Sequence, residues 1–162
     1  MLIIGISGKH GQGKSRTAVA IAAQLKRCTI ISVYDIVKFY NNYQSIEERN
    51  AIVSQIREVR EDYLIDSLKI RIALASSLYD TFIIDDIFDS ILMNQIKREL
   101  NAQIVGVEKP ELHKLPLIIR DNIAAGVIGE PDYILRFSAN YNELLKEVNK
   151  LLEALKAKGL TV

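Results

Sequence analysis

The chain has 162 residues, of which 49% are hydrophobic and 25% are charged, and these proportions predict one globular domain with its own core. Its 21 basic and 20 acidic residues leave a net charge of +1, and no run of basic residues is longer than two. This balance argues against nucleic acid as a partner, because proteins that bind it usually carry a basic stripe.

The compartment and the membrane can be judged from the same composition. Cys28 is the single cysteine, so no internal disulfide can form and the cytoplasm is the expected location. The apolar start at residues 1–8 lacks a basic n-region and is too short for a signal peptide. No stretch approaches the ~20 apolar residues of a membrane-spanning helix, and we therefore expect no membrane contact.

In the first half of the chain, strands and helices alternate. The apolar patterns predict a buried strand at 2–7, a helix at 15–26, a β-branched strand at 28–33, a short helix at 34–42 and a long helical stretch from 45 to 78. Ser45 and Glu48 form a capping-box pattern where the long stretch begins, and a break is expected near Asp62.

The second half continues the alternation. We predict strands at 81–85, 103–107 and 133–137, a helix at 90–100 capped by Asp89 or Ser90, and a closing amphipathic helix at 140–156. Residues 110–131 hold all three prolines and are predicted to be an excursion that serves as a lid. Alternating elements of this kind predict a three-layer α/β fold, with a parallel sheet between helices.

A phosphate-binding motif follows the first strand. Residues 8–15 match G-x-x-x-x-G-K-S, with glycines at Gly8, Gly11 and Gly13. The glycines let successive backbone N–H groups point at one anion, and the helix that follows adds its positive end. Lys14 is predicted to reach the β- and γ-phosphates of ATP. A chance match is the alternative, but the strand before the motif and the helix after it favour a P-loop.

The residues around the loop predict a magnesium site. The Ser15 hydroxyl is expected to bind Mg²⁺, Arg16 and Thr17 open the helix, and Thr17 could touch the α-phosphate. A second carboxylate ligand is expected at the end of the strand at 81–85. Asp85 is the first choice and Asp86 the alternative; a purely structural role as a helix cap suits Asp89 or Ser90 better.

In their order, these segments resemble the P-loop nucleoside monophosphate kinases, and most closely the small phage-type deoxynucleoside monophosphate kinases. The resemblance covers most of the chain and is carried by residues 2–18, 32–38, 59–61, 83–87, 131–134 and 142–144. It implies a P-loop NTPase fold with strand order 2-3-1-4-5. It also implies Mg²⁺- and ATP-dependent phosphoryl transfer to a nucleoside monophosphate, with acceptor-binding helices at about 34–78.

The resemblance also implies roles for particular residues. Arg60 matches the arginine on the helix that faces the acceptor, while Asp35 and Lys38 match a pair beyond the second strand. Asp35 would orient an acceptor that is already anionic, or act as a base if the acceptor were a hydroxyl, as in dephospho-coenzyme A kinase. Asp35 and Lys38 could instead simply pair across one helical turn. The chain departs from the family at Phe88, where an arginine is common.

Phosphoryl transfer needs further cations, because negative charge gathers on the donor and the acceptor. Arg57 on the acceptor side, and Lys114 and Arg120 in the excursion, are candidates, although each suits a solvated helix face equally well. Without an acceptor, the chain would be a P-loop ATPase or a nucleotide-gated binding module. The sequence is compatible with a monomer or a homodimer.

The histidines and two tyrosines could also take part in ligand binding, but no such role is favoured for them. His10 occupies a variable loop position and His113 has no partner at ligand spacing, so neither is predicted to bind a metal. Tyr40 and Tyr43 could stack on a base, but packing at a helix edge is the favoured reading.

Overall fold

The computed structural model describes residues 1–9, 11–109, 128–138 and 140–162. Within these ranges no helix is both long and apolar enough to cross a membrane. In chain order the elements are β1 (Leu2–Ser7), α1 (Lys14–Ala22), β2 (Cys28–Ser32), α2 (Val33–Tyr40), α3 (Ile46–Val59), α4 (Tyr63–Ala75), β3 (Thr81–Ile87), α5 (Ser90–Leu100), β4 (Gln103–Glu108), β5 (Tyr133–Arg136) and α7 (Tyr141–Ala157).

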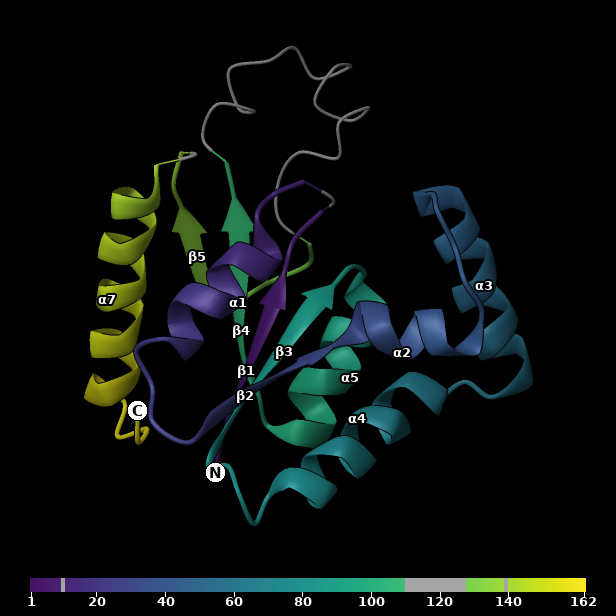
Figure 1. Cartoon of the computed structure of the whole chain (residues 1–162), viewed down its shortest axis with the longest axis horizontal. Coiled ribbons are helices and arrows are strands. Elements are labelled where there is room, and N and C mark those ends of the chain that lie inside the picture. The colour runs from purple at the N-terminus through teal and green to yellow at the C-terminus, as the bar shows by residue number, and fades with distance from the viewer. Residues whose placement is uncertain (10, 110–127, 139) are drawn as a thin grey trace.

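The strands form one parallel sheet in the order β2-β3-β1-β4-β5. Parallel neighbours need crossover connections, and from β1 to β4 the described helices supply them. Helices cover both faces, with α1 and α7 on one side and α4 and α5 on the other, while α3 lies outermost (Figure 1). The predicted three-layer α/β fold and its strand order are therefore confirmed.

Each face of the sheet carries its own core, because successive side chains of a strand point to opposite faces. In β1, Ile3 packs with the core on the α4 and α5 side, whereas Ile4 and Ile6 pack with α1 and α7. In β3, Phe82 and Ile83 divide in the same way. Burial on both faces explains why these strands are apolar runs and do not alternate with polar residues.

The first helix is shorter than predicted. The sequence pattern runs to Lys26, whereas α1 ends at Ala22. The chain then tightens, and the Gln24 N–H donates to the Ile21 carbonyl at 3.0 Å. Arg27 adopts a positive φ of 49° and turns the chain into β2. The apolar pattern could not locate this end, because the residues after Ala22 still suit a helix.

The predicted helix signals in the middle of the chain are confirmed. The Ser45 hydroxyl accepts the Glu48 N–H at 3.1 Å, and the Glu48 carboxylate accepts the Gln44 N–H at 2.6 Å. These bonds hold the start of α3 as a capping box does. The long stretch breaks near Asp62, which is the N-cap of α4, and Asp89 is the cap of α5.

The predicted lid cannot be compared with the structure over most of its length. Of residues 110–131, only 128–131 are described. Lys114 and Arg120, two of the predicted cations, lie outside the described residues, as do both histidines.

Candidate functional site

The P-loop connects β1, the central strand of the sheet, to the start of α1. Gly11 and Gly13 adopt φ values of 78° and 91°, which side chains with a Cβ rarely adopt. Gly13 is the N-cap of α1, and no side chain caps that end. The first N–H groups of α1 are therefore available to an anion, as the motif predicts.

Two contacts attach the loop to the neighbouring strands. The Gly8 N–H donates to the Ile87 carbonyl at 3.3 Å. The Gln12 side chain is only 1% exposed, and its Oε1 accepts the Lys109 N–H at 2.9 Å. The loop is thereby held to the ends of β3 and β4.

Lys14 is buried at the centre of the site. Its Nζ lies 3.1 Å from Asp86 Oδ1 and donates to the Lys9 carbonyl at 3.1 Å. A buried ammonium needs such partners, because its charge is costly away from water. A phosphate entering the loop would compete with the Asp86 carboxylate for Lys14.

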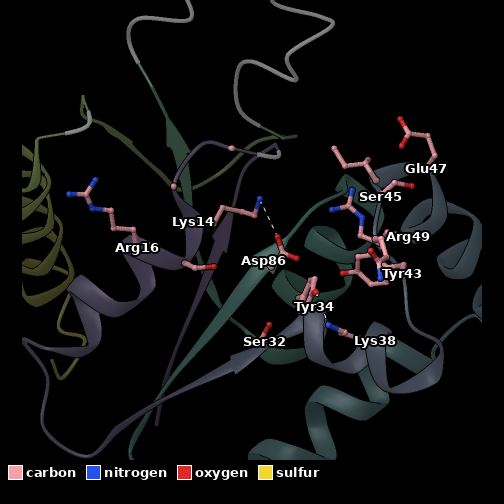
Figure 2. Close-up of a pocket in the computed structure, with 15 residues that line it drawn as sticks. Lys14, Arg16, Ser32, Tyr34, Lys38, Tyr43, Ser45, Glu47, Arg49 and Asp86 are labelled. Atoms are coloured by element: carbon pink, nitrogen blue, oxygen red, sulfur yellow. Dashed lines mark hydrogen bonds and ion pairs between the residues drawn. The ribbon is translucent and has the colours of Figure 1, made fainter.

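Asp86 has an unusual backbone conformation that aims its side chain. Its φ is 63°, in the left-handed region that Asp tolerates better than most residues. The register between β1 and β3 shifts at this point, because Gly5 pairs with Ile84 but Ser7 pairs with Ile87. This bulge turns Asp86 toward the loop, and Lys14 and Asp86 face each other in Figure 2.

Asp85, unlike Asp86, is buried and does not line the pocket. It is 5% exposed, accepts the Asp86 N–H at 2.6 Å and is hydrogen-bonded by the side chain of Ser15. Burial raises the pKa of Asp85 above its usual value, while the bond from Ser15 opposes the rise. Asp85 is therefore held beneath the loop, and Asp86 is the carboxylate that lines the pocket.

The oxygen donors beside the loop suit Mg²⁺. The Ser15 hydroxyl and the Asp85 carboxylate are in contact, and Asp86 is adjacent. In the described ranges, no group of three or more His, Cys, Asp or Glu side chains could hold a metal. A cation here would thus take its other ligands from phosphate and water, which is how Mg²⁺ commonly binds.

A cavity of about 890 Å³ opens between the P-loop and the start of α3 (Figure 2). It is lined by Gly11, Gly13, Lys14, Ser15, Arg16, Ser32, Tyr34, Lys38, Tyr43, Gln44, Ser45, Ile46, Glu47, Arg49 and Asp86. One side carries the P-loop residues, and the other carries side chains from α2, α3 and the segment between them. The cavity is therefore large enough for phosphates and a second small molecule.

The wall opposite the P-loop combines aromatic rings and a cation. Tyr34 and Tyr43 meet edge to face, with ring centroids 5.1 Å apart. The Lys38 ammonium donates to the Tyr34 hydroxyl at 3.1 Å, so it does not need Asp35 as a partner. Burial raises the pKa of Tyr43, and the charge of Asp86 adds to the rise.

Arg49 is the second cation of this wall. It is 9% exposed, and its guanidinium lies 4.3 Å from the centroid of the Phe88 ring. Its guanidinium donates two hydrogen bonds to Asn50 Oδ1, at 3.2 and 3.4 Å. Figure 2 shows its guanidinium turned toward the side of the pocket that carries Lys14.

The structure brings only some of the predicted acceptor residues to the pocket. Lys38 lines it, but Asp35 and Arg60 do not. Arg60 is exposed and forms an ion pair with Asp66. The backbone N–H of Asp35 donates to the Ser32 hydroxyl at 3.4 Å, so this residue opens α2.

The remaining predicted residues have defined surroundings. Arg57 forms two contacts with Asp89, at 2.9 and 3.1 Å, and lies outside the pocket. Thr17 is fully buried, and its hydroxyl donates to the Gly13 carbonyl at 2.9 Å. Arg16 lines the pocket and lies over the Tyr141 ring at 5.6 Å.

Arg49 is not among the site residues predicted from the sequence, although the sequence carries a signal for it. Ile52, Val53 and Ile56 form the buried stripe of α3, and Arg49 continues that stripe one turn toward the N-terminus. A charged residue on an apolar stripe is unusual and indicates a specific partner. Of the two tyrosines that could stack on a base, Tyr43 lines the pocket, whereas Tyr40 packs against Tyr63 outside it.

Sequence comparison and structural comparison give different information about this chain. Neither a protein-family model nor a curated protein sequence matches it. Among solved structures, TT1252 from Thermus thermophilus superposes with a TM-score of 0.60 at 15% identity, covering 99% of this chain and 98% of the other.

Two further neighbours are kinases. The Mycobacterium tuberculosis APS kinase, in complex with AMPPNP and APS, has a TM-score of 0.54 at 11% identity, covering 96% of this chain and 97% of the other. The dephospho-CoA kinase from Campylobacter jejuni has a TM-score of 0.52 at 14% identity, covering 98% of each. At such low identities the likeness shows the fold alone, and this chain shares that fold with these structures.

Proposed function

We propose that this protein transfers the γ-phosphoryl group of ATP to a nucleoside monophosphate, with a deoxynucleotide as the preferred acceptor. The observation that carries the proposal is the shared cavity. The P-loop forms one side of it, and the tyrosine pair with Lys38 and Arg49 forms the other. A hydrolase needs only the first side, whereas transfer to a second small molecule needs both.

The reaction would break the bond between the γ-phosphorus and the oxygen that bridges it to the β-phosphate. A new bond would join that phosphorus to a phosphate oxygen of the acceptor, giving ADP and a nucleoside diphosphate. Catalysis then consists mostly of holding both phosphates in line and stabilising their charge. Lys14 and the N–H groups at the start of α1 would hold the donor, with Gly8, Gly11 and Gly13 shaping the loop.

Ser15 and Asp85 would hold Mg²⁺, with Asp86 beside them. The cation would neutralise part of the charge on the β- and γ-phosphates. Asp86 would leave Lys14 when phosphate takes its place, because both anions compete for one ammonium. Arg60 and Asp35 remain predictions for the acceptor side, and Arg120 and Arg57 remain predictions as additional cations.

A hydroxyl acceptor is the second candidate, and the position of Asp86 favours it. Asp86 is the carboxylate that lines the pocket beside Lys14, so it could accept a proton from a hydroxyl. The similar fold of dephospho-CoA kinase is compatible with such a reaction. A P-loop ATPase or binding module would leave the wall of Tyr34, Tyr43 and Arg49 without a role.

The decisive experiment supplies ATP and Mg²⁺ with each nucleoside monophosphate in turn, and measures ADP release and the phosphorylated product. We expect one or more monophosphates to stimulate ATP consumption and to appear as diphosphates. If no natural monophosphate does so but a hydroxyl compound becomes phosphorylated, the second candidate is correct. If ATP is consumed at the same rate with every acceptor, the kinase proposal is wrong.

A further inference from the structure

Phe88 lies in the turn between β3 and α5, and its ring contacts a cation that lines the pocket. The Phe88 ring is partly buried and packs against the core on the α4 and α5 side of the sheet. A ring fixed in this way offers a flat surface next to the pocket. Arg49 occupies that surface, with its guanidinium 4.3 Å from the ring centroid.

None of the residues that the structure describes neutralises the charge on Arg49. Its guanidinium donates to the neutral side-chain amide of Asn50. Across the part of the chain that the structure describes, no carboxylate forms an ion pair with Arg49. A cation that is nine-tenths buried and lines a cavity is costly without an anion, so the missing anion is expected to come from a ligand.

The other cations near this wall are either paired with a carboxylate or exposed to water. Arg57, two turns further along α3, binds Asp89 through both terminal guanidinium nitrogens. Lys38 donates to the neutral Tyr34 hydroxyl, but its side chain is exposed, so water compensates its charge. Stacking on Phe88 uses the face of the Arg49 guanidinium and leaves its N–H edges for an anion.

We propose that Arg49 binds the anionic group of the acceptor and that Phe88 is its positioning residue. The start of α3 thereby supplies a cation on the side of the pocket opposite the P-loop. The inference rests on the proposed function, in that the anion would be the acceptor's phosphate. It also identifies which arginine on this side of the site contacts the acceptor, because Arg60 and Arg57 lie outside the pocket.

The test compares Arg49→Ala, Arg49→Lys, Phe88→Leu and Phe88→Tyr with the wild type. Calorimetry measures the affinity of the ADP-loaded protein for deoxynucleoside monophosphates, for the matching nucleosides and for inorganic phosphate. Steady-state kinetics gives the acceptor KM and kcat. Circular dichroism checks that each variant folds, and Arg98→Ala is the control because Arg98 is exposed on α5, outside the pocket.

Arg49→Ala should weaken monophosphate binding by about 10- to 150-fold, because a charge-assisted hydrogen bond is lost. Arg49→Lys should restore little of this, since an ammonium neither stacks nor presents a planar fork. ATP affinity should change by less than about twofold in both, because the P-loop is untouched. Binding of the nucleosides should also be unaffected.

The Phe88 variants separate positioning from packing. Phe88→Leu keeps an apolar side chain but removes the ring, and should raise the acceptor KM roughly 2- to 30-fold with little change in kcat. Phe88→Tyr keeps the ring and should restore the wild-type KM. If both variants fold but behave alike, Phe88 only packs, and its positioning role is refuted.

Failure of this inference can be told apart from failure of the proposed function. If the wild type binds monophosphates through Arg49 but makes no diphosphate, the kinase proposal fails and the binding role survives. If diphosphate forms and Arg49→Ala binds the acceptor normally, the inference is wrong. A greater loss in Arg60→Ala than in Arg49→Ala would also overturn it, and so would a wild type that binds neither monophosphate nor inorganic phosphate.

Discussion

Two adjacent carboxylates at the end of β3 have different tasks because the backbone turns between them. Asp85 points beneath the P-loop and is held by Ser15, whereas Asp86, with φ at 63°, faces Lys14 in the pocket. Neighbours on a regular strand would also face opposite ways, but the bulge decides which of them reaches the loop. The expectation that Asp85 is a metal ligand therefore stays a prediction that mutation can test.

We predict that Asp85→Asn lowers turnover much more than ATP affinity, because the metal matters most as charge develops during transfer. Turnover across a Mg²⁺ series, with ATP affinity from calorimetry, would measure this. A variant with wild-type turnover at every Mg²⁺ concentration would remove Asp85 from the metal site.

The same variant should show how burial of Asp85 affects stability. Burial raises the pKa of Asp85, so the native state binds its proton more tightly than the unfolded state does. The stabilisation from protonated Asp85 is fully present below the pKa that Asp85 has in the unfolded chain. It is lost as pH rises through the higher pKa that Asp85 has in the native state. In metal-free urea unfolding, the wild type should therefore lose stability relative to Asp85→Asn as pH increases over this window; a constant difference would contradict the pKa shift.

Among the elements, α3 depends on the turn between β3 and α5 for its position. Arg49 contacts Phe88, and Arg57 contacts Asp89, which also caps α5 through the Leu92 N–H at 2.8 Å. One short turn therefore contacts the start of α5 and both halves of α3. Along one face of this outermost helix in Figure 1, Ile52, Val53 and Ile56 are also buried.

We expect Asp89→Ala to lower the free energy of unfolding by about 1–3 kcal/mol, because it removes a helix cap and leaves Arg57 half-buried without its partner. Asp80→Ala is the matched control. It breaks the Arg27–Asp80 pair, which is exposed, and should cost at most ~1 kcal/mol. Urea unfolding of both variants provides the comparison, and equal losses would show that the Asp89 contacts contribute nothing special.

For the whole molecule, nucleotide binding should appear as increased stability, because the P-loop joins the central strand to α1 and is anchored to β3 and β4. At a MgATP concentration of about 100 Kd, the native state should gain ~2.7 kcal/mol, or about 5–10 °C in melting temperature for a chain of this size. Thermal unfolding with and without MgATP measures the gain.

Lys14→Ala should abolish most of that gain and leave the circular dichroism spectrum unchanged. The gain is measured against the melting temperature of the ligand-free variant, because the substitution removes the partner of Asp86 and can itself change stability. A variant that MgATP stabilises as strongly as the wild type would contradict the P-loop assignment.

The sequence by itself determined the P-loop, the alternation of strands and helices and most element boundaries, because these follow from local patterns. Glycine spacing sets the loop conformation, apolar runs identify strands buried on both faces, and capping residues mark helix starts. The order of the strands came from resemblance, because a pattern of elements does not determine which strands become neighbours.

Only the tertiary structure decided which charged residues share the pocket. Arg49, Arg57 and Arg60 are alike in sequence, but the packing of α3 against the core on the α4 and α5 side buries the first against Phe88, pairs the second with Asp89 and leaves the third exposed. The bulge that aims Asp86 likewise depends on the pairing of β1 with β3. Such contacts join residues far apart in the chain, and local sequence carries little information about them.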